Sequence, residues 1–263
     1  MNKKKRTIIT VVVAVLVVMI AASGGYLLFK HLNTSNTKKK YSELASSYAQ
    51  LTVASDEVVT DESGVPLKPN PVDFASLQAQ NSDIYSWIKI PNTNVDYPVL
   101  RSETDDNFYI DHDYEKDYSF AGAIYSQFCN HRDYSDRVTV LYGHNMADNS
   151  MFASLHSFED ATFFEENREM TIYTPDKQLD YDIVSAFVYD DRHIMNSFDF
   201  TKDDVYRDFL DSVINPHSVS SNVRTGVTLD INDRIVILST CLNYGDGRYL
   251  VVGKLTGETP LAP

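Results

Sequence analysis

Arg234-Ile235-Val236-Ile237-Leu238-Ser239-Thr240-Cys241 is an apolar, β-branched run that ends in a cysteine. The turn-prone residues Asn243-Tyr244-Gly245-Asp246-Gly247 come before a second apolar run, which opens with Arg248 and extends to residue 255. Such runs favour strands, and the turn residues between them favour a hairpin. Two antiparallel strands joined in this way would place Cys241 and Arg248 side by side at one rim of a sheet.

The middle of the chain repeats this pattern of strands and turns. Six further short runs predict strands, at residues 87–90, 96–100, 122–125, 138–142, 170–173 and 179–188. A short helix is expected after Asp73, which would cap it, and its inward-facing residues would be Phe74, Leu77 and Ile84. A second helix is expected over 203–214, with an apolar side made of Val205, Phe209, Val213 and Ile214. Many short strands with few helices predict a mainly β fold, either a closed barrel or a sandwich.

Residues 7–29 contain no charged side chain. A helix of this length rises about 34 Å, which is enough to cross a hydrocarbon core of about 30 Å. The basic residues 3–6 come directly before it, so the positive-inside rule places the N-terminus in the cytoplasm and the remainder outside the cell. The small residues 21–24 also suit a cleaved signal peptide, but the apolar run continues to Phe29, which favours an uncleaved anchor in the cell membrane.

These features divide the chain into four parts. We expect a basic cytoplasmic N-terminus at 1–6, a transmembrane anchor at 7–29, a stalk with a short helix (within 38–57) at 30–70, and one folded domain at 71–263. The net charge is −14, and residues 1–30 hold five basic and no acidic residues, so the remainder carries −19. An acidic domain repels phosphate backbones, which argues against nucleic acid as a partner.

A thiol at the end of a strand, beside a loop and a fixed positive charge, has the surroundings that make cysteines reactive. Cys241 beside Arg248 fits this description. A cysteine nucleophile also needs a proton partner, and His144 is the best candidate because it follows a glycine at the end of the predicted strand 138–142. The other histidines of the domain lie in polar, charged stretches and are interpreted as surface residues: His112, His131, His156, His193 and His217.

Three alternatives stay open on the residues alone. Cys129 and Cys241 are the only cysteines, and outside a cell they could pair in a binding domain that has no enzymatic activity. Together with His131 and His144 they could bind zinc, although Cys-x-His is not a usual zinc spacing. A cysteine peptidase that hydrolyses its substrate would need the same pair of Cys241 and His144.

Residues 237–241, Ile-Leu-Ser-Thr-Cys, resemble the sortase signature Thr-Leu-x-Thr-Cys, with Ile in the first position. Arg248 matches the arginine that opens the next strand in that family. Three further segments are similar to class B sortases, namely Asp96-Tyr97-Pro98-Val99, Tyr142-Gly143-His144-Asn145-Met146 and Ser150-Met151-Phe152. The long insert before the cysteine strand is also similar, and the resemblance covers about residues 72–256.

The resemblance implies an eight-stranded sortase barrel with N-terminal helices and one inserted helix. It implies a cysteine transpeptidase of a Gram-positive bacterium, which cleaves a C-terminal sorting motif of secreted proteins, opening with Asn-Pro or a related pair, after its Thr. The acyl group would pass through a thioester to an amine of peptidoglycan, of its precursor or of a pilin lysine. No cofactor and no metal are implied. The implied catalytic residues are His144, Cys241 and Arg248, and the implied substrate contacts are Ser239, Thr240 and Asn145.

Overall fold

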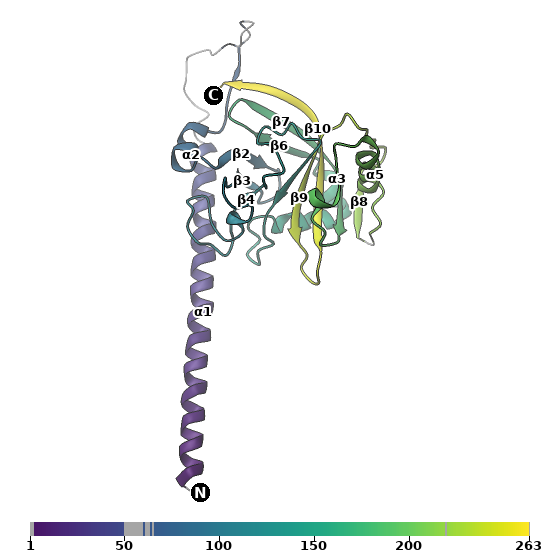
Figure 1. The fold of residues 1–263 in the computed structure, drawn as a ribbon. Coiled ribbons are helices and arrows are strands. Elements are labelled where there is room, and N and C mark those ends of the chain that lie inside the picture. Colours follow the sequence, from purple (N-terminus) through teal and green to yellow (C-terminus); the bar gives the residue numbers. More distant parts are fainter. Residues whose placement is uncertain (1–2, 50–59, 61–63, 65, 219, 263) are drawn as a thin grey trace.

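The computed structural model describes residues 3–49, 60, 64, 66–218 and 220–262. One long helix, α1 (Lys3–Ala49), stands beside a β domain and extends far beyond it toward the N-terminus (Figure 1). The strands lie on one side of the C-terminal half of α1, and the short helix α2 lies beside the end of α1, so the first half of this helix has no domain around it.

Eight strands of the domain close into a barrel. In order around the barrel they are β10 (Arg248–Ala262), β9 (Ile235–Cys241), β5 (Val138–Tyr142), β4 (Ile124–Tyr125), β3 (Asp96–Leu100), β2 (Ile84–Lys89), β6 (Glu169–Tyr173) and β7 (Lys177–Tyr189). The barrel closes because β7 pairs with β10 in antiparallel fashion. Two short strands, β1 (Lys68–Pro69) and β8 (Ser221–Val223), extend the sheet beyond β10 and β7. The predicted mainly β fold is confirmed, in the form of a closed barrel of eight strands.

The helices of the domain are short: α2 (Phe74–Gln80), η1 (Phe108–Ile110), η2 (Ala153–Glu159), α3 (Ala161–Glu166), α4 (Ile194–Ser197) and α5 (Asp203–Ile214). Asp73 caps α2 as predicted, since its carboxylate accepts a hydrogen bond from Ser76 N at 2.9 Å. Ile84 is buried as expected, but it is the first residue of β2 and not part of that helix.

The predicted inserted helix is α5, with the expected bounds. Its buried residues are Tyr206, Phe209, Leu210 and Val213, whereas Val205 and Ile214 are only half-buried. The buried face is therefore turned about the helix axis relative to the prediction. Tyr206 explains the difference, because its hydroxyl reaches inward and donates to Asp233 O at 2.7 Å while its ring packs in the apolar layer under α5.

Strand β9 is buried on both of its faces. Val236 and Leu238 pack into the barrel core, and Ile235 and Ile237 pack into a second apolar cluster under α5. This two-sided burial explains why the sequence of β9 is continuously apolar and does not alternate. Each of these four side chains is at most 2% exposed, whereas Cys241, the last residue of the strand, is exposed. The thiol is thus carried by a strand that is held from both sides.

The C-terminal half of α1 packs along the domain. The predicted stalk, residues 30–70, begins inside this helix, which continues without a break from the apolar stretch to Ala49; residues 50–57 of the predicted stalk helix lie outside the described residues. Tyr41 is buried, and its hydroxyl donates to Gly122 O at 3.1 Å. The hydroxyls of Thr37 and Ser119 share a 2.8 Å hydrogen bond. The first part of the stalk region is therefore docked on the domain.

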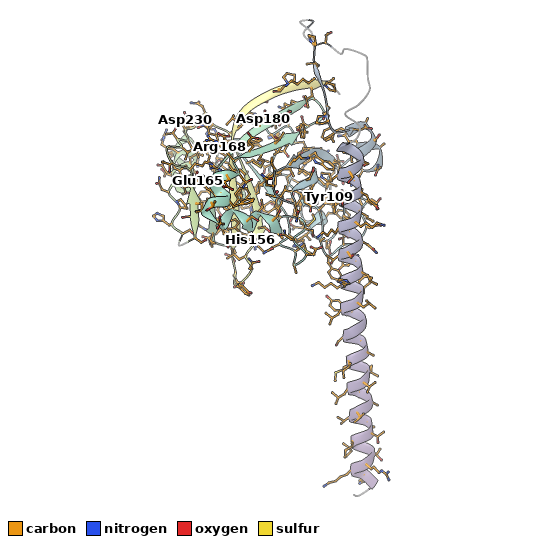
Figure 2. All side chains as sticks on the ribbon, turned by 180° about the vertical axis from the view of Figure 1, so that it is seen from behind. Tyr109, His156, Glu165, Arg168, Asp180 and Asp230 are labelled. Atoms are coloured by element: carbon orange, nitrogen blue, oxygen red, sulfur yellow. The ribbon has the colours of Figure 1, made fainter. Side chains whose placement is uncertain are left out.

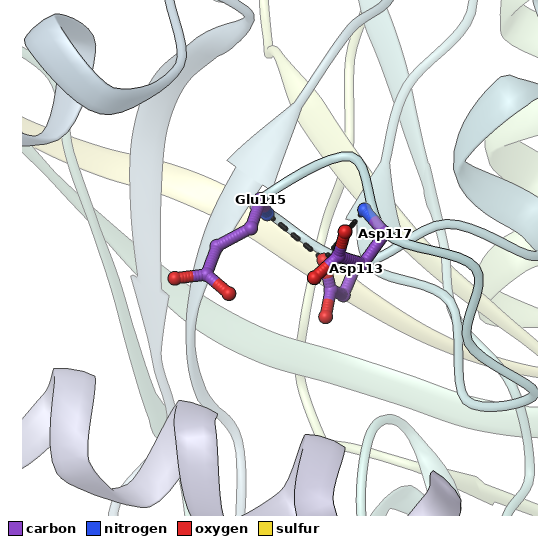
Figure 3. Close-up of side chains that lie close together, drawn as sticks. All are labelled: Asp113, Glu115 and Asp117. Carbon is purple, nitrogen blue, oxygen red and sulfur yellow. Dashed lines mark hydrogen bonds between the residues drawn. The ribbon is translucent and has the colours of Figure 1, made fainter.

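Three carboxylates hold the docked helix. Figure 3 shows Asp113, Glu115 and Asp117 close together, and the backbone N–H groups of Glu115 and Asp117 donate to Asp113 Oδ1. Their spacing would suit a metal ion, but Lys40 Nζ of α1 lies 2.9, 2.6 and 3.0 Å from one oxygen of Asp113, Glu115 and Asp117. Because the ammonium offsets the repulsion among the carboxylates, the cluster acts as an ion-pair network that fastens α1 to the domain.

We expect Lys40→Gln to destabilise the protein by about 1–2 kcal/mol, between the values typical of exposed and of buried ion pairs. The substitution removes the charge on which three carboxylates converge. Chemical unfolding of the full chain in detergent measures the change. Lys39→Gln is the matched control, because Lys39 contacts a single exposed partner, Glu43, at 3.5 Å. Equal stability of the two variants would contradict the assigned role of Lys40.

Candidate active site

Cys241 and Arg248 meet at one end of the barrel. They are directly opposite each other in the antiparallel pairing of β9 with β10, and Arg248 Nη1 lies 3.4 Å from Cys241 Sγ. The loop between them turns at Gly247, whose φ of +151° and close approach to Tyr189 O leave no room for a Cβ atom. The sequence pattern thus predicted the neighbours correctly, and the backbone of the loop determines how close they come.

His144 follows β5, the other neighbour of β9. These two strands run parallel, with Tyr142 opposite Ser239, so their C-terminal ends lie at the same rim. His144, Cys241 and Arg248 line one small cleft, whose other lining residues are Ile110, Tyr125, Tyr142, Gly143, Ser239 and Thr240. Position 143, just before His144, fits a glycine, because a Cβ atom there would lie 2.6 Å from the side chain of Ile124. The structure therefore brings together the three residues predicted to be catalytic.

The imidazole of His144 is oriented by a backbone carbonyl. Its Nε2 lies 2.7 Å from Ile110 O, at the end of η1. A carbonyl oxygen can only accept, so Nε2 carries a proton and donates it to this bond, and in the neutral ring Nδ1 is the nitrogen that can take up a proton. Sequence reasoning found no residue that orients His144, because the partner is a main-chain atom and has no side-chain signal.

Two tyrosines of the cleft stay protonated at neutral pH. Burial raises the pKa of Tyr125 to about 12, although the positive charge of Arg248 acts in the opposite direction. Burial also raises the pKa of Tyr142 well above its ordinary value. Neither hydroxyl can exchange a proton readily near pH 7, so neither tyrosine is a candidate for the proton partner of the thiol, and His144 remains the candidate.

His156 was predicted to be a surface residue, and that prediction is wrong. Its ring is stacked on Tyr249 at 4.9 Å between centroids, and its side chain is only 11% exposed. Nε2 lies 3.0 Å from Cys241 O, and Nδ1 lies 2.5 Å from Glu159 Oε1. Figure 2 shows His156 at the end of the barrel that faces the N-terminal part of α1. The residue lies in η2, far from Cys241 in sequence, so only the fold revealed the contact.

Asn145 also contacts the backbone of the nucleophile candidate. Its Nδ2 donates to Cys241 O at 3.1 Å and to Asn243 Oδ1 at 2.9 Å. Ser239 and Thr240 are buried in β9, at 4% and 2% exposure, and both line the cleft. Of the polar side-chain atoms in the described part of the chain, Thr240 Oγ1 is one of a few that are buried without a hydrogen-bond partner. Ser239 and Thr240 thus line the cleft, whereas Asn145 is not among its lining residues and is bonded to the strand that carries the thiol.

Cys129 lies in a different part of the surface. Both cysteines are free thiols, so the structure has no Cys129–Cys241 disulfide. Cys129 lines a separate pocket with Arg137, Phe198 and other residues. Partial burial, reinforced by the carboxylate of Asp106, raises the pKa of its thiol. The nearby His131 is hydrogen-bonded through Nδ1 to Asp136 at 2.7 Å.

Fold and site together define a class of protein: enzymes that carry a free, exposed cysteine at the rim of a closed β-barrel, with a guanidinium and an imidazole beside it. The comparisons with known proteins agree. A model of the sortase domain matches residues 88–256. Sortase B of Listeria monocytogenes serovar 1/2a is 32% identical over 192 residues, which are 70% of this chain and 74% of that protein.

Two further comparisons point the same way. Sortase B of Staphylococcus aureus, strain NCTC 8325 / PS 47, is 31% identical, over 69% of this chain and 74% of that protein. The structure of a Staphylococcus aureus sortase B–substrate complex superposes with a TM-score of 0.71 and 27% identity, over 86% of this chain and 98% of that one. The chain belongs to the sortase family of cysteine transpeptidases, and these relatives are class B sortases.

We expect Arg248→Leu to slow alkylation of Cys241 by iodoacetamide. The thiolate is the reactive form of cysteine, and Arg248 places the positive charge of its guanidinium 3.4 Å from the sulfur. Peptide mass spectrometry follows Cys241 separately from Cys129. Arg192→Leu is the control, because Arg192 pairs with Asp190 on the surface. An unchanged rate in Arg248→Leu would mean that the guanidinium does not act on the thiol.

His156→Phe should lower the rate of peptide cleavage by about tenfold, the effect of losing one net hydrogen bond of about 1.4 kcal/mol. Phenylalanine preserves the ring stack on Tyr249 but cannot bind Cys241 O or Glu159. Steady-state turnover of a sorting peptide measures the loss, and circular dichroism checks that the fold is retained. A normal rate would reduce the role of His156 to packing.

Proposed function

We propose that this chain cleaves a C-terminal sorting motif of secreted proteins between Thr and the next residue and transfers the acyl group to an amine. The observation that carries the proposal is the 3.4 Å contact between Arg248 Nη1 and Cys241 Sγ, in a cleft that His144 also lines. Membership of the sortase family supports the reaction type.

The first half of the reaction forms a thioester. The Cys241 thiolate adds to the Thr carbonyl carbon, and a C–S bond forms while the oxygen becomes an oxyanion. Arg248 stabilises this charge through a charge-assisted hydrogen bond. The C–N bond then breaks, and the departing amine takes a proton from His144.

The second half reverses the proton transfer. An acceptor amine attacks the thioester carbonyl, gives a proton to His144 and releases the Cys241 thiolate, so that a new amide bond replaces the C–S bond. Transfer in preference to hydrolysis requires that the amine is bound close to the thioester. The proposed acceptor is an amine of peptidoglycan or of its precursor, or the lysine of a pilin.

The proposed donor carries a motif that opens with Asn-Pro or a related pair. The resemblance of residues 142–146 and 150–152 to class B sortases supports a motif that opens with Asn-Pro. The Staphylococcus aureus sortase B has been solved as a substrate complex. Ser239 and Thr240 would contact the peptide, because both line the cleft. Asn145 would act on the peptide indirectly, through Cys241 O.

We further propose that α1 anchors the enzyme in the cell membrane through residues 7–29, with the N-terminus in the cytoplasm and the domain outside. α1 is, in the described part of the chain, the one helix long and apolar enough to cross a membrane. The basic residues 3–6 support this orientation. The large apolar side chains of residues 8–29 are exposed, as lipid-facing residues would be.

The decisive experiment measures turnover of two fluorogenic peptides, one opening with Asn-Pro and one with Leu-Pro, with and without an amine acceptor. Wild type should cleave the Asn-Pro peptide and form an acceptor-linked product. Cys241→Ala should show no turnover, and His144→Ala and Arg248→Lys should each lose several orders of magnitude; lysine lacks the planar fork of arginine.

Each unexpected result of this experiment would contradict a different part of the proposal. Turnover retained by Cys241→Ala would eliminate Cys241 as the nucleophile. Cleavage without an acceptor-linked product would indicate a hydrolytic cysteine peptidase. Cys129→Ala is the matched thiol control and should retain the wild-type rate, because Cys129 lines a different pocket.

A further inference from the structure

A loop of the domain is bound to α1 at the point where the apolar stretch of this helix ends. The ring of Phe120 packs edge-on against Tyr26 and Phe29, at 6.2 and 6.0 Å between centroids. Asn33 fixes the loop backbone, because its Nδ2 donates to Tyr118 O at 3.0 Å and its Oδ1 accepts from Phe120 N at 3.0 Å. The loop is thus held by both an apolar and a polar contact.

These contacts fix the position of the loop along the axis of α1. Tyr26 and Phe29 are the only aromatic residues of the uncharged run 7–29, and both lie at its C-terminal end. At 1.5 Å per residue, Tyr26 lies about 5 Å before the end of this run. The Phe120 ring that packs against Tyr26 therefore lies at the same depth. Aromatic side chains at this depth are typical of the membrane–water interface. Lys30 Nζ lies 5.6 Å from the Phe120 ring centroid, where its charge can meet lipid headgroups.

The loop is also joined to the active site. Ser119 N donates to Asp111 O at 2.8 Å, next to Ile110, whose carbonyl binds His144. The side chains of Ile110 and Tyr118 are large, apolar and 44% and 48% exposed. The Tyr118 ring packs against the Phe120 ring at 5.3 Å between centroids, and contiguous apolar groups commonly mark an interaction surface.

The active-site end of the barrel is also tied to α1. Lys38 of α1 donates to Asp148 O at 2.7 Å, in the loop that begins with His144, and Lys38 lies nine residues after Phe29, or about 14 Å along the helix. The loop between β9 and β10 extends from the barrel in the direction of the N-terminal part of α1 (Figure 1). Its residue Tyr244 is 92% exposed.

We infer that Ile110, Tyr118 and Phe120, here called the interfacial rim, contact the surface of the lipid bilayer and hold the mouth of the active site toward it. The inference rests on the proposed anchoring of α1. A bilayer fits this surface better than a protein partner, because the rim is continuous with a helix that would itself be in lipid. Since the domain is strongly acidic, the contact is made by apolar side chains and does not require anionic lipid.

The experiment uses the full chain in vesicles of zwitterionic phosphatidylcholine, with and without bromine on the acyl chains near the headgroup. Trp87 is the single tryptophan, and Trp87→Phe removes its signal. In that background Tyr118→Trp should lose emission in brominated vesicles. Ile110→Trp provides a second probe on the rim and should also be quenched.

Tyr173→Trp is the matched control and should not be quenched. Tyr173 pairs with Gln178, at the end of β7 opposite to Tyr189, which itself pairs with Arg248 at the active-site rim. Tyr173 is half-buried, so a tryptophan there is still accessible to lipid if the domain lies the other way.

Flotation and turnover separate the outcomes. Unquenched Tyr118→Trp and Ile110→Trp in protein that floats with vesicles would overturn the interfacial rim and leave the anchor intact. Quenching of Tyr173→Trp as strongly as Tyr118→Trp would also overturn it, because the domain would have no fixed orientation. Protein that does not float would overturn both the anchor and the rim, whereas peptide turnover by the wild-type full chain in the same vesicles tests the transpeptidase reaction independently.

Discussion

The two-sided burial of β9 is the constraint on which the site depends. Its side chains pack into the barrel core on one face and under α5 on the other, so the strand cannot shift without exposing large apolar area. Its neighbours are β5, which runs parallel, and β10, which runs antiparallel. One neighbour therefore ends, and the other begins, at the rim where Cys241 is exposed, and this places His144 and Arg248 beside the thiol.

The side chains at this rim are positioned mostly through main-chain atoms. Ile110 O orients His144, and the carbonyl of Cys241 is contacted by both Asn145 and His156. Cys241 O belongs to barrel strand β9 and Ile110 O to the short helix η1, so both acceptors are positioned by the fold before substrate binds, which favours catalysis. The exposed thiol remains open to a peptide and then to an amine, as a transpeptidase requires.

Helix α1 connects this chemistry to the membrane proposal. The segment that carries Ile110 is bonded to the loop that α1 holds through Asn33, and Lys40 fastens the neighbouring carboxylates. One continuous helix thus contributes both the proposed anchor and a docking surface. A flexible stalk would not define the orientation of the cleft, whereas a docked helix in the proposed anchor would fix it relative to the bilayer.

The sequence by itself determined the eight barrel strands, the bounds of α5, and the juxtaposition of Cys241 with Arg248, because apolar periodicity and turn residues are local signals. The position of His144 beside Cys241 was also predicted, from its place after a strand and a glycine. Only the tertiary structure decided that His156 binds the Cys241 carbonyl, that Ile110 O orients His144, and that α1 docks through Lys40. Each of these contacts joins residues far apart in the chain, two of them through backbone atoms, and local patterns carry no information about such pairs.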